Sequence, residues 1–290
     1  MGPVAARPRP AGLPTLALRS RKTVVGGTVL LLVIAAAMLA PWLAPYPVTE
    51  MHPTAKLAPP GGAFPLGADF YGRDTLSRIL YGYRTSLLVA AASVLFALTV
   101  GGTLGVVAGY LGRTWDAVIM RGMDILFAFP VLLLAITIVV ILGPGTPTTI
   151  LAIGIVYVPI FARIARGPTL VVKEQAYIEA AHALGQRTWR IIARHVAPNV
   201  STPILVQATI NLATAILFES ALSFLGLGTQ PPFPSLGLMV SEGRNYLELT
   251  PWPAVFPGAA IVLAVLGFNL LGDSLQEWLD PRLRPTWTAA

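Results

Sequence analysis

Residues 86–111 read SLLVAAASVLFALTVGGTLGVVAGYL and carry no charged side chain. An α-helix rises about 1.5 Å per residue, so about 20 apolar residues cross a hydrocarbon core roughly 30 Å thick. The stretch lacks the alternation of polar and apolar residues that a strand of a membrane β-barrel shows. It therefore predicts a membrane-spanning helix.

Five further apolar segments have similar lengths, and they cover residues 24–43, 119–142, 148–165, 203–227 and 254–271. The first is longer than the roughly 7–15 apolar residues of a signal peptide, so we expect it to remain as a span. Of the 290 residues, 55% are hydrophobic and 11% are charged, whereas soluble domains are about 25% charged. This composition excludes a soluble globular enzyme and favours an all-α polytopic membrane protein with six transmembrane helices.

The basic residues predict the orientation of the chain. An even number of spans places both termini on one side, and Lys and Arg gather in cytoplasmic segments. With the N-terminus inside, the inner segments hold most of the 20 basic residues. We expect a cytoplasmic tail at 1–23, a membrane domain at 24–284 with a long inner loop at 166–202, and a tail at 285–290. The net charge of +7 fits membrane contact and requires no nucleic acid.

The chain lacks the motifs of several kinds of active site. No phosphate-binding loop of the form GxxxxGK[ST] occurs, and neither GxSxG nor HExxH is present. The three histidines are scattered and there is no cysteine, so no metal site is predicted. The sequence therefore indicates a protein that is not an enzyme and that binds no cofactor itself.

The inner loop contains two short amphipathic segments. Residues 175–184 are rich in good helix formers, and Gly185 is expected to end that helix. A second helix is expected over residues 189–195, ending before Pro198. The small residues Ala180, Ala181 and Gly185 would then be exposed, where a cytoplasmic partner could dock closely. A solvated basic loop is the alternative.

Three charged residues fall in or beside the predicted spans. Glu219 lies near the outer end of its span, so it either lines a translocation path or sits at a hydrated rim, and the short distance to the outer loop favours the rim. Arg121 and Asp124 are three residues apart, so they share a helix face. They form either a gate or a pair that neutralises itself, and the pair is favoured.

Small residues and prolines predict how the spans pack. Gly101, Gly105 and Gly109 recur every four residues and form a strip that another helix can approach closely. Pro130 and Pro159 each remove a helix hydrogen bond, so we expect kinks there.

The inner loop also resembles a known motif. Glu179-Ala180-Ala181, followed by Gly185 and Pro198, is similar to the EAA loop of ABC importer permeases. The outer stretch around Asp69, Arg73, Asp74 and Arg78 is similar to that of peptide-importer permeases, as are the segments around Arg121–Asp124 and Glu219–Gly228. The resemblance covers residues 24–284 and is nearest to the C-type subunit of dipeptide and oligopeptide importers. It implies the MetI-like permease fold.

The resemblance implies a role in a larger assembly. The EAA loop of the family couples the permease to an ATPase, which assigns coupling to the five motif residues Glu179, Ala180, Ala181, Gly185 and Pro198. The expected partners are a homologous second permease in a heterodimer, two ATPase subunits that bind ATP and Mg, and an extracytoplasmic substrate-binding protein. The expected location is the cytoplasmic membrane of a bacterium or archaeon.

Two questions stay open from the sequence. Asp69, Arg73, Asp74 and Arg78 either form a docking rim for the binding protein or pair among themselves to brace the outer loop. The solute is expected to be a di- or oligopeptide, with nickel, glutathione or another small solute as alternatives within the same family. A membrane scaffold that transports nothing and an ion-coupled transporter are the alternatives outside it.

Overall fold

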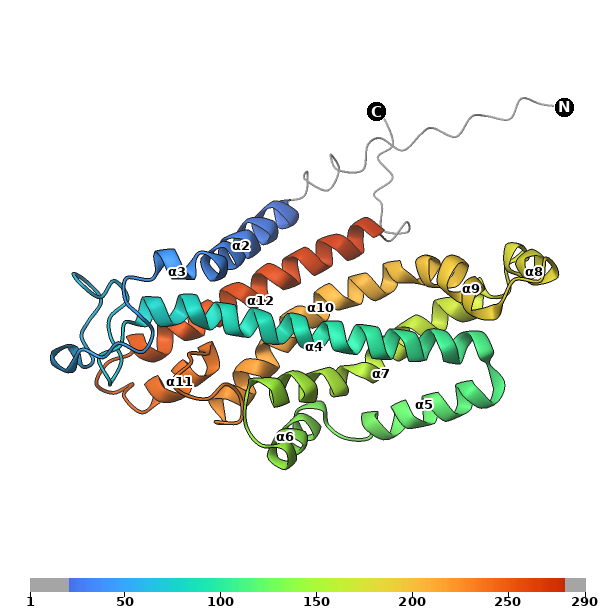
Figure 1. Ribbon diagram of the computed structural model, residues 1–290. Helices are drawn as coiled ribbons and strands as arrows, with labels where there is room; N and C mark the ends of the chain where they lie inside the picture. The colour runs from blue at the N-terminus through green and yellow to red at the C-terminus, as the bar shows by residue number, and fades with distance from the viewer. Residues whose placement is uncertain (1–20, 280–290) are drawn as a thin grey trace, which may run out of the picture.

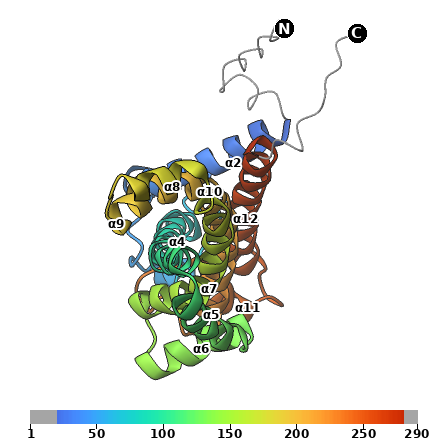
Figure 2. The same cartoon turned by 90° about the vertical axis from the view of Figure 1, so that its right-hand side faces the viewer.

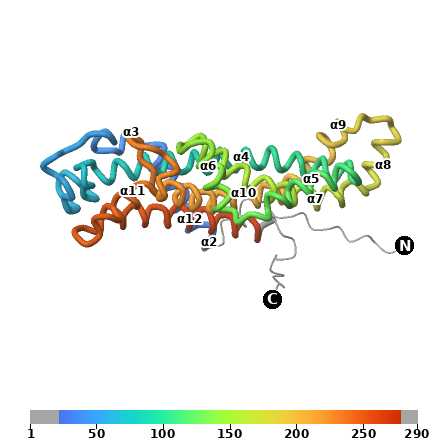
Figure 3. Tube along the Cα trace, turned by 90° about the horizontal axis from the view of Figure 1, so that it is seen from below, coloured from blue at the N-terminus to red at the C-terminus, as the bar shows by residue number. Residues whose placement is uncertain are grey.

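The computed structural model describes residues 21–279, and within them the regular elements are helices (Figure 1). They form an elongated bundle (Figure 3). The short helix α11 (Leu236–Arg244) and the loop at 44–74 lie at one end, and α8 (Ala176–Ala183) and α9 (Thr188–Ile191) lie at the other. These are called the α11 end and the α8 end below.

The long helices are α2 (Arg21–Met38), α4 (Thr75–Leu111), α7 (Thr146–Val172), α10 (Ala197–Phe224) and α12 (Trp252–Leu279). The shorter elements are α3 (Ala40–Leu43), α5 (Arg113–Phe127), α6 (Val131–Leu142), a 3₁₀ turn at Pro53–Ala55 and a π turn at Ile192–Val196. Seen from the α8 end, α4, α7, α10 and α12 lie together, with α2 at one margin and α5 and α6 at the opposite margin (Figure 2).

Within residues 21–279, four helical stretches are long and apolar enough to cross a membrane: Thr75–Leu111, Thr146–Val172, Thr188–Phe224 and Trp252–Glu277. The bent pair α5 and α6 could supply a fifth crossing, and α2 is apolar but shorter. The all-α membrane class is thus confirmed, while the count of six spans stays a prediction. Residues 1–20 of the expected N-terminal tail and the whole expected tail at 285–290 lie outside the described residues.

Helix α4 begins earlier than the hydropathy pattern predicts. The expected span starts at residue 86, but the helix starts at Thr75, where the Asp74 side chain accepts a hydrogen bond from the backbone N–H of Ser77 at 2.8 Å. The polar first turns are packed inside the protein, and Ser77 and Arg78 are buried. Hydropathy misses such turns because protein neighbours, not lipid, surround them.

The predicted glycine strip on α4 is the contact surface for α7. A Cβ atom at Gly101 would lie 2.3 Å from the carbonyl oxygen of Val158, and one at Gly105 would lie 2.1 Å from that of Ala162. At Gly109 the nearest atom would be Cβ of Thr169 at 2.9 Å. The close approach of a second helix is therefore confirmed, and the partner is α7.

The helix expected over 119–142, with a kink at Pro130, is divided into two helices. α5 ends at Phe127, α6 begins at Val131, and their axes meet at 89°. Pro130 caps the start of α6, where its missing N–H needs no helical partner. The expected kink at Pro130 is thus a full break. At Pro159, by contrast, α7 continues without interruption.

The expected end of a helix before Pro198 is also wrong. The helical path runs from Thr188 to Phe224 through the π turn. The backbone N–H of Ala197 reaches back to the carbonyl of Ile192, which widens the turn just before the proline. Because the hydrogen-bond register shifts there, Pro198 is accommodated in the first turn of α10.

Candidate functional site

Helix α8 ends in a Schellman motif at the glycine that the sequence singles out. The N–H of Gly185 donates to the carbonyl of His182 at 2.9 Å, and the N–H of Gln186 donates to that of Ala181 at 3.1 Å. Gly185 has φ +73°, a conformation that costs an L-residue steric strain. No described atom lies within 4 Å of a Cβ added there. Its backbone angle, and not a contact within this chain, requires glycine.

One face of α8 packs on the bundle and the other is exposed. Ile178 and Ala181 are buried, whereas Glu179, Ala180 and Gly185 are exposed. The expectation that Ala181 is exposed is therefore wrong, because it shares the inner face with Ile178 three residues earlier. Pro198 is exposed at the start of α10.

Large apolar side chains are exposed around α8. Leu184 is 80% exposed and Trp189 is 61% exposed, and Tyr177 is exposed as well. An exposed apolar patch beside an exposed short helix is typical of a protein–protein interface. The α8 end therefore has the composition of a docking surface.

Two side-chain contacts join α8 to the long helices. The hydroxyl of Tyr110, in the last turn of α4, lies 2.7 Å from Nε2 of His182. The amide of Asn199, in the first turn of α10, donates to the hydroxyl of Tyr177 at 3.4 Å. Neither pair could be predicted from the sequence, since the partners are 72 and 22 residues apart. The two contacts join α8 to the end of α4 and to the start of α10.

The expected pairing of Arg121 with Asp124 is wrong. Asp124 accepts a hydrogen bond from Nη2 of Arg163 on α7 at 2.7 Å. A second ion pair joins the same helices, between Asp116 and Arg166 at 2.6 Å. Asp124 points across to α7 instead of along its own helix. The sequence did not indicate this, because helix spacing defines neighbours only within one helix.

Glu219 is enclosed by protein, so the expectation of a hydrated rim residue is wrong. Its side chain is fully buried. It accepts hydrogen bonds from the hydroxyls of Ser86 on α4 at 2.6 Å and Ser223 on α10 at 2.8 Å. α11 packs close by, since a Cβ at Gly237 would lie 2.1 Å from the carbonyl oxygen of Ser220. The carboxylate thus ties α10 to α4.

The four charged residues of the outer stretch are buried at the α11 end. Arg73 donates to Asp69 at 2.6 Å and to Glu242 on α11 at 2.8 Å. Arg78 donates to the same Glu242 oxygen at 3.1 Å. Asp74 caps α4. This is the geometry expected of a brace between the outer loop and α11. The sequence did not single out Glu242, which lies on the short helix α11 outside the predicted spans.

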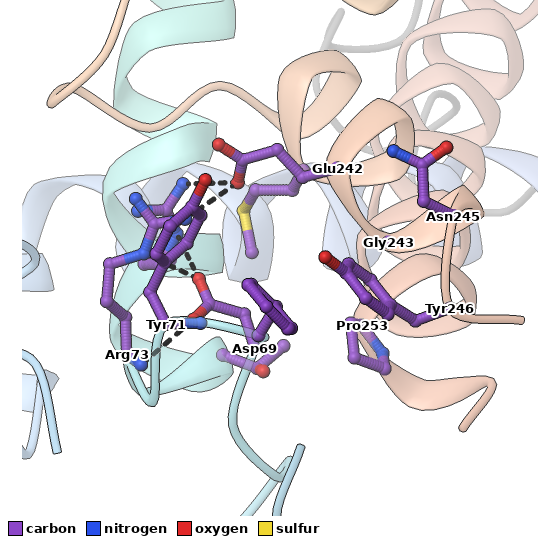
Figure 4. A pocket seen from close by; sticks show the side chains of 12 residues that line it. Asp69, Tyr71, Arg73, Glu242, Gly243, Asn245, Tyr246 and Pro253 are labelled. Atoms are coloured by element: carbon purple, nitrogen blue, oxygen red, sulfur yellow. Dashed lines mark hydrogen bonds and ion pairs between the residues drawn. The ribbon is translucent and has the colours of Figure 1, made fainter. Parts of the chain in front are cut away.

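A small cavity of about 90 Å³ lies beside this network. Figure 4 shows Asp69, Arg73 and Glu242 joined by hydrogen bonds on one side and Tyr246 on the other. Phe70 and Tyr246 stack with ring centroids 4.6 Å apart. The aromatic pair lines the cavity opposite the charged network.

Comparison with known proteins places these features in a family. Residues 101–285 match the family described as "Binding-protein-dependent transport system inner membrane component". Residues 18–60 match the "N-terminal TM domain of oligopeptide transport permease C". Together the two matches cover most of the chain.

Permease proteins from several bacteria align with most of this chain and over most of their own length. The dipeptide transport system permease protein of Alkalihalophilus pseudofirmus is 44% identical over 92% of this chain and 88% of its own length. The glutathione transport system permease protein of Pectobacterium atrosepticum is 44% identical over 92% and 89%. The di/tripeptide transport system permease protein of Pseudomonas aeruginosa is 43% identical over 91% and 89%.

The fold has a solved counterpart. A chain of the inward-facing MetNI methionine ABC transporter aligns with a TM-score of 0.56 at 19% identity, covering 70% of this chain and 96% of that chain. This similarity confirms the MetI-like permease fold expected from the sequence. With the helical bundle, the family matches and the relatives in agreement, this chain belongs to the binding-protein-dependent transport system inner membrane components, the membrane permeases of ABC transporters.

Proposed function

We propose that the chain is the C-type permease subunit of an ABC importer for di- and oligopeptides in a bacterial cytoplasmic membrane. It forms half of the translocation path, with both termini and the α8 end in the cytoplasm. The relatives include dipeptide and di/tripeptide transport permeases, which supports peptides as the solute. The similarly related glutathione permease makes glutathione, itself a small peptide, the second candidate.

The proposal includes partners that supply what the sequence lacks. Two ATPase subunits bind ATP and Mg, a homologous second permease completes the path, and an extracytoplasmic binding protein delivers the peptide. The absence of a phosphate-binding loop from the sequence fits this division of labour.

The observation that carries the proposal is the exposed helix α8. Its outward face carries Glu179 and Ala180, and Leu184 stands beside it, largely exposed. An ATPase subunit would bind this face and move α8, and the contacts of Tyr110 and Asn199 would pass the movement to α4 and α10. ATP binding and hydrolysis would then switch the spans between two states for which the ATPases have different affinity.

The outer network acts as a brace in this scheme. Arg73 and Arg78 are buried, so their side chains support the loop that faces the binding protein. The exposed neighbours Phe70 and Tyr71 would contact it instead. Glu219 has a similar positioning role between α4 and α10.

Uptake in cells lacking only this subunit tests the proposal. Restoring the gene should restore uptake of labelled di- and tripeptides, and depleting ATP with ion gradients clamped should abolish it. Restored glutathione or nickel uptake without peptide uptake would keep the permease and overturn the peptide assignment. No uptake of any solute, with the protein present in the membrane and bound to ATPase subunits, would indicate a scaffold.

A further inference from the structure

The two ion pairs between α5 and α7 line an open groove between these helices. The groove has a volume of about 460 Å³. Its charged lining consists of three arginines and two aspartates: Asp116, Arg121, Asp124, Arg163 and Arg166. The formal charge of the groove is therefore +1.

The groove lies toward the end of α7 that leads into the expected inner loop at 166–202. Arg163 is about 14 Å along α7 from the end of that helix at Val172, at 1.5 Å per residue. The side chains of Arg163 and Asp124 are 50% and 59% exposed. Exposed charged side chains on a membrane protein face water or a polar partner, because hydrocarbon does not solvate them.

Helix α5 separates this polar face from an apolar one. Trp115, Val118 and Ile125 are all more than half exposed on the adjoining face of the helix, which begins beside Arg121. Such side chains suit lipid or an apolar partner. The two faces of α5 thus meet different surroundings, and the charged face is the one suited to water.

Arg121 has no compensating charge within the described residues. Asp116 and Asp124 are held by Arg166 and Arg163, and no carboxylate of residues 21–279 lies within 4 Å of Arg121. A guanidinium in that position presents N–H groups that match the two oxygens of a carboxylate.

We infer that the α5–α7 groove is a water-filled wall of the translocation path and that Arg121 contacts the carboxylate of the passing peptide. The inference rests on the proposed function and names the residue that meets the solute. The ion pairs to Arg163 and Arg166 hold the groove open by fixing α5 against α7.

Adjacent positions on α5 test the hydration of the groove. The chain has no cysteine, so single Ala117→Cys and Val118→Cys variants in the assembled, nucleotide-free transporter each give one reactive thiol on this chain. Ala117 lines the groove and Val118 lies on the apolar face. A charged methanethiosulfonate, followed by the mass of this chain, should modify Ala117→Cys at least tenfold faster. Equal rates, or an unreactive Ala117→Cys because the second permease covers the groove, would overturn the inference.

Protection by peptide tests the role of Arg121. Millimolar tripeptide with a free carboxylate should slow modification of Ala117→Cys at least threefold, and its C-terminal amide should protect less. Adding Arg121→Gln should remove the difference between acid and amide. If the difference persists, Arg121 does not contact the carboxylate. A wild-type transporter that moves no peptide would instead refute the proposed function, and the thiol rates would still report whether the groove holds water.

Discussion

Single residues set the local geometry at both ends of the bundle. Gly185 ends α8 because its φ of +73° completes the Schellman motif. Glu219 joins two helices because its two oxygens accept from Ser86 and Ser223, serines on different helices. At Gly185 the missing side chain lets backbone N–H groups bond the last carbonyls of α8. At Glu219 the carboxylate accepts hydrogen bonds from two serine hydroxyls.

Uptake by variants at Gly185 should decrease as the new residue tolerates a positive φ less well. Gly185→Asn should retain most uptake, Gly185→Ala should lose about 1–2 kcal/mol of local stability, and Gly185→Val should transport least. Uptake at matched membrane abundance measures this. Gly258→Ala, at an ordinary helical position with open space, is the control. Normal uptake by Gly185→Val would show that the positive φ is dispensable.

Replacement of Glu219 should separate hydrogen bonding from charge. Glu219→Ala leaves two buried serine hydroxyls without an acceptor and should destabilise the protein by about 1–3 kcal/mol. Glu219→Gln keeps an acceptor and should lose less. The thermal unfolding midpoint of the purified complex reports the difference. Glu248→Ala, at an exposed carboxylate, serves as control, and an equal effect there would rule out a special role for Glu219.

At the scale of elements, the pairing of α4 with α7 forms the centre of the bundle. Backbone meets backbone at Gly101 and Gly105, and α5 and α10 pack around this pair. Helix α8 is attached to it through Tyr110 and His182. The elements that would move during transport are therefore connected to the most closely packed helices.

The α4–α7 contact should tolerate no extra atom. Gly105→Ala would place a methyl group 2.1 Å from the carbonyl oxygen of Ala162, and overpacking of this kind costs about 1–3 kcal/mol. Gly102→Ala, three residues earlier on α4, would add a methyl group with no neighbour within 4 Å. Melting midpoints should fall for the first variant and stay unchanged for the second. Equal midpoints would mean that α7 shifts without cost.

A charge reversal on the exposed face of α8 should lower uptake more than a charge reversal just outside the helix. Glu179→Arg should lower uptake at least tenfold with normal membrane abundance, because it reverses a charge on the face proposed to bind the ATPase. Glu174→Arg, an exposed carboxylate just before α8, should have a small effect. Co-purification of ATPase subunits gives a second measurement. Loss of function in both variants to the same extent would point to general electrostatics.

At the scale of the whole molecule, the two ends of the described chain lie side by side, away from the α11 end (Figure 1). Nζ of Lys22, in the first turn of α2, is 3.4 Å from Oε1 of Glu277 near the end of α12. The loop at 44–74 and α11 lie at the opposite end (Figure 3). The arrangement gives one outer and one inner surface once the membrane orientation is known.

The proposed orientation predicts which thiols are accessible from each side. Ala63→Cys, in the exposed loop of the α11 end, should react with an impermeant reagent in intact cells. Ala183→Cys, at the exposed end of α8, should react only in inverted vesicles. The native sequence has no cysteine to interfere. The reverse pattern would overturn the inward placement of α8.

The sequence by itself determined the class of protein and the positions of most helices. Long uncharged segments can be stable only in lipid or in a buried core, so residues 86–111 and their counterparts predict spans without knowledge of packing. The glycine strip and the break at Gly185 were likewise predictable, because backbone conformation and small size act locally.

Only the tertiary structure decided which charged groups meet. Asp124 pairs with Arg163, Glu219 with Ser86, and Arg73 with Glu242, all across large separations in sequence. Helix spacing describes neighbours within one helix, whereas these partners depend on how helices rotate and cross. Burial of Glu219 and Ala181 was unpredictable for the same reason, since burial depends on which face of a helix its neighbours cover.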